Sequence, residues 1–237
     1  MVHFVLSFTI FWRLVLAHLI ADFTLQTNRM AAWKRESFWG TLAHSLLFGL
    51  CAAILCWPQT INSWQIFGAR VVLPGWVVIF IIMALHFCED QWRVLAIRKH
   101  EKEDSFAFFV WDQGFHIGVI ALLSPAFAGV MEKWVLLAIL AVFATHFLTI
   151  VIYYLEKRTI GEAQIVTGEK YWFMAERLAI MSAVMLPGWW AASFIAVWLI
   201  RPAASGVGGR FYFKTKSFFG NLIALACGII ARCVMNA

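Results

Sequence analysis

The chain has 237 residues, of which 62% are hydrophobic and 14% are charged, with a formal net charge of +6 at pH 7. Soluble domains average about 45–50% apolar and roughly 25% charged residues, so this composition excludes an ordinary soluble globular domain. The positive charge does not indicate a nucleic-acid partner, because the basic residues stand in short segments between apolar runs, where they suit anionic lipid headgroups.

Apolar segments of about 17–25 residues are typical of membrane-spanning helices. The first apolar segment carries Arg13, His18 and Asp22 and lacks a small-residue cleavage site, so we interpret it as a mature helix rather than a signal peptide. The tract at 172–201 is interrupted by Pro187-Gly188, which predicts two short spans. The other predicted spans are 4–25, 38–57, 71–89, 106–127, 134–155 and 215–235.

These segments predict an all-α, polytopic transmembrane bundle of about eight helices, or seven if the tract at 172–201 is one kinked helix. We expect one integral membrane domain over residues 1–237. Within it, 1–130 would form a four-helix half that carries the motifs, and 131–237 would supply supporting helices. The five cysteines show no CxxC spacing and are interpreted as reduced packing residues.

Basic residues concentrate in alternate loops. The segments after the first, third, fifth and seventh spans each hold three or four Lys or Arg residues, whereas the intervening connections are nearly neutral. The positive-inside rule therefore predicts that these loops are cytoplasmic, in a cell (inner) membrane, with the N-terminus outside. The loops concerned are 26–37, 90–105, 156–171 and 202–214.

Each of the four aspartates lies four residues from one of the seven histidines. Residues at this spacing share one face of a helix, one turn apart. The pair His100/Asp104 falls in the charged run RKHEKED, which we interpret as a solvated segment. The other three pairs lie on spans one, three and four: His18/Asp22, His86/Asp90 and Asp112/His116.

At about 1.5 Å per residue, these pairs and His44 of span two lie at a similar depth in the cytoplasmic half of the bundle. An ionisable group in the bilayer core costs at least ~2.5–3.5 kcal/mol, so such groups are kept when they pair, bind an ion or relay protons. Histidine and aspartate together are ligands for zinc, manganese or iron. Seven residues are more than the four ligands of one tetrahedral metal ion. They would suit one metal whose histidine ligands are oriented by further carboxylates, or a two-metal centre. The predicted ligands of this divalent metal are His18, Asp22, His44, His86, Asp90, Asp112 and His116.

Other interpretations of the pairs stay open. They could be polar contacts that fix helix packing, or a proton or ion relay. His146 of span five is interpreted as a hydrogen-bonding residue between helices. Glu176 and Arg177 could form an ion pair with another helix, or the guanidinium could bind an anionic substrate.

The segments LAHLIADFTLQTNRMAAWK, LAHSLLFG, ALHFCEDQWR and FVWDQGFHIGV resemble a bacterial membrane family known as domain of unknown function 3307. The likeness covers roughly residues 10–125, and Glu176-Arg177 matches an E-R pair of longer members. It implies a membrane fold and site residues, not a reaction. The family's H-x3-D-F-x-L-Q motif falls on His18, Asp22, Phe23, Leu25 and Gln26, and its helix histidine falls on His44. Its H-x3-D-x2-K motif falls on His86, Asp90 and Arg93, which stands in place of the lysine. Its D-Q-x2-H motif falls on Asp112, Gln113 and His116.

We expect a membrane-embedded metal-dependent hydrolase that acts near the cytoplasmic face on a lipid-linked or membrane-delivered substrate. Asp90 or Asp112 would be the general base, with Gln26, Arg93, Gln113, Glu176 and Arg177 as substrate-binding residues. Membrane lipids are the expected partners, and a homo-oligomer is compatible with the sequence. The alternatives are a proton- or cation-coupled transporter with the cluster as its ion site, and a membrane scaffold. Transporters often show internal repeats with paired broken helices, and only one tract is broken here, which favours the enzyme.

Overall fold

The structure is a computed structural model that describes residues 2–67, 70–99, 104–125, 132–160, 167–188, 192 and 211–236. The predicted all-α fold is confirmed, because the described residues are helical apart from turns and one two-stranded sheet. On helix α3 (Phe38–Leu55), Leu46, Leu50 and Ile54 are exposed at intervals of four residues, which is the apolar stripe expected of a helix that faces lipid. Four described helical segments are long and apolar enough to cross a membrane: Phe38–Leu55, Phe106–Leu123, Lys133–Thr159 and Phe218–Asn236.

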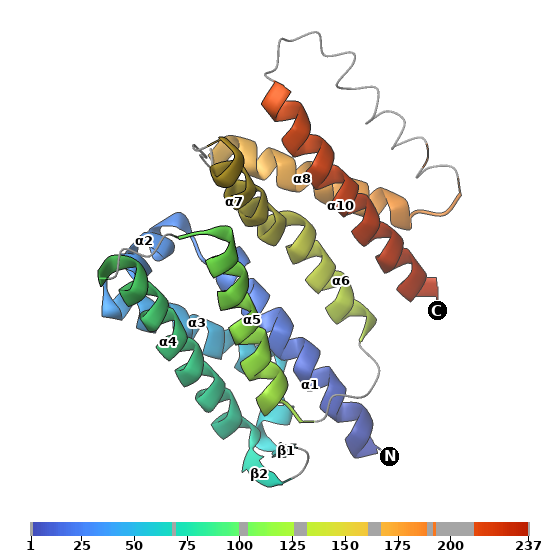
Figure 1. Cartoon of the computed structure of the whole chain (residues 1–237). Coiled ribbons are helices and arrows are strands. Elements are labelled where there is room, and N and C mark those ends of the chain that lie inside the picture. The colour runs from blue at the N-terminus through green and yellow to red at the C-terminus, as the bar shows by residue number, and fades with distance from the viewer. Residues whose placement is uncertain are drawn as a thin grey trace. The chain divides into compact units, whose positions relative to one another are not determined.

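The chain divides into two compact units, Met1–Val135 and Leu136–Ala237. In the first unit, four helices lie side by side, with the short helix α2 at one end and a β-hairpin at the other (Figure 1). The elements of this unit are α1 (Val2–Leu19), η1 (Ile20–Thr24), α2 (Asn28–Glu36), α3 (Phe38–Leu55), η2 (Gln59–Ile61), β1 (Ser63–Ile66), β2 (Val71–Pro74), α4 (Gly75–Lys99) and α5 (Phe106–Leu123).

The helix α2 lies in the segment that the sequence predicted as a loop. The hydroxyl of Thr27 caps it by accepting a bond of 3.1 Å from the backbone N–H of Met30. None of its residues is buried, so the apolar periodicity of a spanning helix is missing. It packs against α3 where Gly40 lies beside the backbone of Trp33, so closely that a Cβ at position 40 would collide with the Trp33 carbonyl.

The prediction of a helix from residue 71 was wrong for its first four residues. Val71–Pro74 form strand β2, which pairs antiparallel with β1 in the register Ser63↔Pro74. Valine is favoured in strands, and Gly75 then lets the chain pass the Trp64 ring, 2.6 Å from where a Cβ would lie. The helix α4 also continues to Lys99, ten residues beyond the predicted end of the span.

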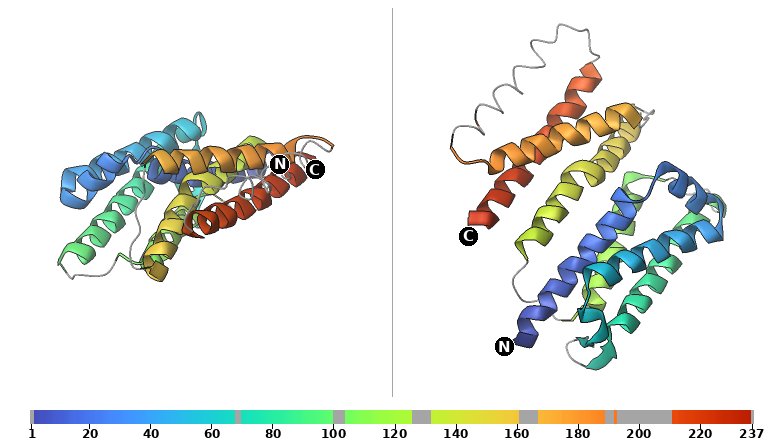
Figure 2. Two further views of the ribbon diagram at one scale, coloured as in Figure 1. Left: turned by 90° about the horizontal axis from the view of Figure 1, so that it is seen from above. Right: turned by 180° about the vertical axis from the view of Figure 1, so that it is seen from behind.

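The second unit contains a helical run in which the π-helix η3 (Phe143–Phe147) connects α6 (Lys133–Val142) to α7 (Leu148–Ile160). The helices α8 (Thr167–Met185) and α10 (Phe211–Asn236) pack against each other in both views of Figure 2. Small residues at this contact let the helix backbones approach closely. The core residues are Leu140, Ala144, Ile180, Met181, Ala224, Cys227 and Ala231.

The helix α8 ends before Pro187-Gly188, and Gly188 adopts a left-handed conformation with φ of 72°. The predicted second short span of the tract at 172–201 lies almost entirely outside the described residues. All five cysteines are free, and three of them are buried, as expected for packing residues: Cys51, Cys56 and Cys227.

Candidate metal centre

The C-terminal end of the first helix carries the first acidic residue of the site on a π-helical turn. In η1 the bond of 2.8 Å from the Leu25 N–H to the Ile20 carbonyl spans five residues instead of four. Single π-helical turns are rare and occur often at functional sites. This turn begins two residues after His18 and places Asp22 Oδ1 3.4 Å from His18 Nδ1.

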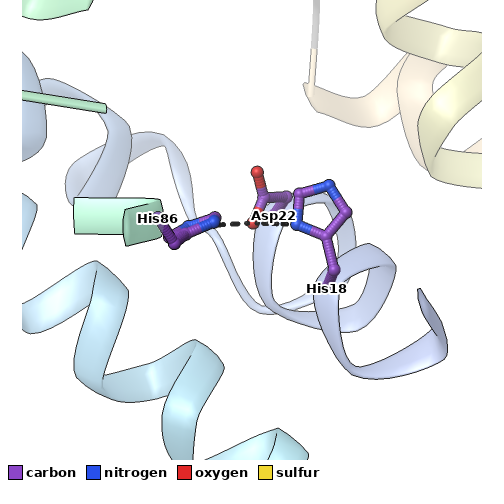
Figure 3. A group of neighbouring side chains, drawn as sticks. All are labelled: His18, Asp22 and His86. Carbon is purple, nitrogen blue, oxygen red and sulfur yellow. Dashed lines mark ion pairs between the residues drawn. The ribbon is translucent and has the colours of Figure 1, made fainter. Parts of the chain in front are cut away.

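Asp22 Oδ1 is also close to imidazoles from two other helices. His44 Nε2 of α3 lies 3.4 Å from it, and His86 Nε2 of α4 lies 3.7 Å from it. Figure 3 shows the Asp22 carboxylate between the rings of His18 and His86. Three helices therefore direct imidazole nitrogens toward one carboxylate oxygen.

His44 and His86 also face each other, with their Nε2 atoms 3.3 Å apart. Asp90, one turn beyond His86 on α4, brings its Oδ2 within 3.3 Å of His86 Nε2 and 3.5 Å of His44 Nε2. The ring of Phe48 stacks on His86 at a centroid distance of 4.9 Å and holds that imidazole in place.

A second group of potential ligands surrounds His116 of α5. Its Nε2 lies 2.9 Å from Glu89 Oε2, 3.6 Å from Asp112 Oδ1 and 3.8 Å from Asp90 Oδ1. Sequence reasoning missed Glu89, although its position three residues after His86 places it on the same face of the helix. The spacing therefore held a signal for this carboxylate.

The structure thus brings all seven predicted ligands together and adds Glu89 to them. All eight side chains are at most 8% exposed. Three groups of them bring one nitrogen or oxygen atom each to within 4.8 Å of one another. These groups are His18, Asp22 and His86; His44, His86 and Asp90; and Glu89, Asp90, Asp112 and His116.

Several of these buried atoms form no hydrogen bond within the described part of the chain. His116 Nε2 is close to Glu89 Oε2, yet the pair lacks the alignment of a hydrogen bond. Buried polar atoms are normally paired, and an unpaired one calls for an ion, a water or a catalytic role. The atoms concerned are Asp22 Oδ1, Glu89 Oε1 and Oε2, Asp90 Oδ2, Asp112 Oδ1 and His116 Nε2.

The spacing of the atoms suits a shared cation better than direct hydrogen bonds. Nitrogen and oxygen atoms bonded to each other through hydrogen are about 2.7–3.2 Å apart. Two ligands at about 2.1 Å from a tetrahedral zinc ion are separated by about 3.4 Å. The separations between Asp22 Oδ1 and its three imidazole nitrogens, 3.4–3.7 Å, match the second distance.

Two cations border the cluster. Lys34 Nζ lies 2.5 Å from Asp90 Oδ1, and Arg93 donates to Asp112 Oδ2 at 3.0 Å and to Asp104 Oδ1 at 2.8 Å. Burial by itself would lower the pKa of Lys34, but the carboxylates, chiefly Asp90, outweigh it and raise the pKa. Sequence reasoning counted Lys34 only as a basic loop residue, because nothing in the sequence shows that α2 folds back onto Asp90.

Gln113 fixes the orientation of two ligands at once. Its Nε2 donates to Asp112 Oδ2 at 2.9 Å, and its Oε1 lies 3.1 Å from His18 Nε2. Because the amide oxygen can only accept, His18 Nε2 carries the proton, and the lone pair of Nδ1 is left to face Asp22. A hydrogen bond of this kind to the far nitrogen is typical of metal-binding histidines.

The model of the family described as protein of unknown function (DUF3307) matches residues 10–144. This match covers more than half of the 237 residues. The chain belongs to the DUF3307 family. Searches of curated proteins and of solved structures each give no significant match. The part of the chain matched to DUF3307 contains all eight cluster residues, whereas Glu176 and Arg177 lie beyond it.

The remaining residues predicted to bind substrate, Gln26, Glu176 and Arg177, are not among the residues grouped in the cluster. Gln26 is half-buried next to η1, and its Oε1 finds no donor among the described residues. Arg177 is buried within the second unit, where it donates to Thr149 Oγ1 at 3.0 Å, and Glu176 precedes it on α8. Their assignment to a substrate stays a prediction.

Proposed function

We propose that this DUF3307 protein is a membrane-embedded, metal-dependent hydrolase whose buried cluster binds one or two divalent cations. The observation that carries the proposal is the set of buried nitrogen and oxygen atoms that approach one another without forming hydrogen bonds. Zinc, manganese and iron all accept such a mixture of imidazole and carboxylate ligands.

The charge of the cluster supports a cation. Four aspartates carry four negative charges when Asp104, the second partner of Arg93, is counted, and Lys34 and Arg93 carry two positive ones, so two negative charges remain before Glu89 is counted. Neutral histidines do not offset this excess. Buried charges need a partner, and a divalent cation would supply it.

A bound divalent cation would supply a Lewis acid and a water molecule of lowered pKa. Glu89 suits the general base better than the predicted Asp90 or Asp112. No donor among the described residues forms a hydrogen bond with either oxygen of Glu89, whereas Lys34 holds one oxygen of Asp90, and Arg93 and Gln113 hold one oxygen of Asp112. One oxygen of Glu89 would take the proton of the attacking water and later pass it to the leaving group, which leaves its other oxygen available to bind the cation.

A substrate delivered by the membrane fits the surface next to the cluster. Trp92 and Trp111 are about half exposed and lie 5.2 Å apart between ring centroids, and Phe115 stacks on Trp111. Each of these three aromatic residues is followed in the chain by a residue of the cluster or by Arg93, which borders it; Trp111, for example, is followed by Asp112. An apolar chain in the bilayer could lie against these rings while Arg93, 16% exposed, faces an anionic headgroup.

The location proposed is the cytoplasmic half of a cell inner membrane. The basic end of the first unit carries α2 and the end of α4, where Arg98 donates to the Glu36 carbonyl at 3.1 Å. Lys and Arg near the ends of spanning helices favour the cytoplasmic side.

The test is the metal content and hydrolytic activity of detergent-purified protein, measured beside the double variant His18→Ala/His116→Ala. We expect bound metal in the natural protein, hydrolysis of a lipid-linked phosphate or ester, and loss of both in the variant. His146→Ala is the matched control, because His146 is a helix histidine outside the cluster. Metal binding with cation flux in proteoliposomes but without hydrolysis would favour the transporter, and absence of metal would overturn both proposals.

A further inference from the structure

The cluster has two parts that differ in the type of side chain they contain. Around Asp22 the ligands are mainly imidazoles, contributed by His18, His44 and His86. Around His116 they are mainly carboxylates, contributed by Glu89, Asp90 and Asp112. Imidazole-rich sites suit zinc, whereas carboxylate-rich sites suit manganese and other hard cations.

Asp90 belongs to both parts. Its Oδ2 faces His44 and His86 at 3.5 and 3.3 Å, and its Oδ1 lies 3.8 Å from His116 Nε2. In two-metal hydrolytic sites the ions are about 3.5–4 Å apart, a separation that one carboxylate can bridge. The rings of His86 and His116 lie 4.1 Å apart between centroids, so the two parts are immediate neighbours.

The carboxylate-rich part contains buried oxygen atoms that have no hydrogen-bond partner within the described residues. Glu89 is 5% exposed, and neither of its oxygens has a hydrogen-bond partner within the described residues. Asp112 Oδ2 is held by Arg93 and Gln113, which leaves Asp112 Oδ1 unpaired on the side of His116. These buried, unpaired atoms indicate that the carboxylate-rich part binds an ion of its own, separate from any ion bound by the imidazole-rich part.

We propose that the cluster consists of two adjacent and chemically different metal sites that share Asp90. This inference rests on the metal binding proposed above and specifies the number and kind of ions. The first site prefers zinc and the second prefers manganese. The first is formed by His18, Asp22, His44 and His86, and the second by Glu89, Asp112 and His116.

Purified protein loaded with zinc and manganese together tests the inference by elemental analysis. We expect two ions per chain, one of each metal. His44→Ala should lose zinc and keep manganese, because His44 contacts residues of the first site and, of the second, only the shared Asp90. Glu89→Gln should lose manganese and keep zinc, because Glu89 contacts only the second. The electron paramagnetic resonance of Mn²⁺ reports the second site independently of the zinc content.

A second pair of variants keeps the result independent of folding. His18→Ala and Asp112→Asn should repeat the two patterns, and His146→Ala should retain both metals. One ion per chain would overturn the two-site inference while leaving a single-metal hydrolase in place. Parallel loss of both metals in all four cluster variants would overturn it in favour of one coupled two-metal site. Absence of metal from the natural protein would overturn the inference together with the proposed function.

Discussion

His44 and His86 direct their Nε2 atoms at each other across 3.3 Å, although they are 42 residues apart in the chain and lie on different helices. Both side chains are at most 3% exposed, so bulk solvent does not reach them. Two neutral imidazoles at this distance either share one proton or direct two lone pairs at a third group. The oxygens of Asp22 and Asp90 next to the same nitrogens favour a cation as that group.

Gln113 offers a test of how His18 is oriented. In Gln113→Leu, the amide that holds the proton on His18 Nε2 is lost, so the ring can turn or change its tautomer. We expect metal affinity to fall about 10–100-fold while the protein still inserts and purifies. Titration of the metal-free protein with zinc measures the change. Gln65→Leu in the exposed hairpin is the control, and equal affinity in the two variants would refute the orienting role.

The close approach of the seven residues could be predicted from the sequence because helix periodicity is local. A spacing of four residues places two side chains on one face, whatever the helix packs against, so the His86/Asp90 and Asp112/His116 pairs could be found without a structure. Because an ionisable side chain in the bilayer core costs free energy, these pairs also stood out among the apolar residues of the predicted spans.

Lys34 could not be predicted in the same way. Its contact with Asp90 depends on the direction in which α2 leaves the bundle, and this is set by the capping at Thr27 and Ser37 and by the close approach at Gly40. The hairpin at Val71–Pro74 was missed for a similar reason. Its pairing with β1 is a contact between segments, whereas apolarity alone suits a strand or a helix.

Gly40 is predicted to control the position of α2. In Gly40→Ala, the added methyl would collide with the backbone of Trp33 and push α2 away from α3. We expect the free energy of unfolding to fall by about 1–3 kcal/mol, as for overpacking, and the Lys34–Asp90 contact to weaken. Thermal unfolding in detergent measures the change.

Gly118→Ala is the matched control for this variant. Apart from its chain neighbours and the backbone of its own helix, no atom of the described residues lies within 4 Å of the position that its methyl would occupy. Alanine is the better helix former by about 1 kcal/mol, so this variant should be as stable as the natural protein or slightly more stable. Equal stability of the two alanine variants would show that the contact at Gly40 has no effect on packing.

Orientation can be tested at the two ends of the first unit. Single cysteines are introduced as Arg98→Cys, near α2, and as Gln65→Cys, in the hairpin, with the exposed Cys88 and Cys233 replaced by serine. An impermeant maleimide should label position 65 in intact cells and position 98 only after the cells are opened. The reverse pattern would invert the proposed topology and place the cluster near the outer face.

The aspartates separate a metal site from simple helix contacts. Asp22→Asn, Asp90→Asn and Asp112→Asn each keep the size and hydrogen-bonding capacity of the side chain but remove its charge. If the carboxylates only join helices, the amides should be tolerated, because such bonds contribute about 0.6 kcal/mol on average. If they bind metal, each variant should lose one or both metals, together with activity, while still inserting and purifying.

Acidification should have the same effect on the natural protein. Metal binding needs neutral histidine and ionised aspartate, so protons compete with the cation and bound metal should leave as the pH falls. Metal content measured against pH, and in the three variants beside their thermal unfolding, decides between the two accounts. Full metal retention in Asp22→Asn, Asp90→Asn and Asp112→Asn would exclude the hydrolase and leave ion transport or helix packing as the role of the cluster.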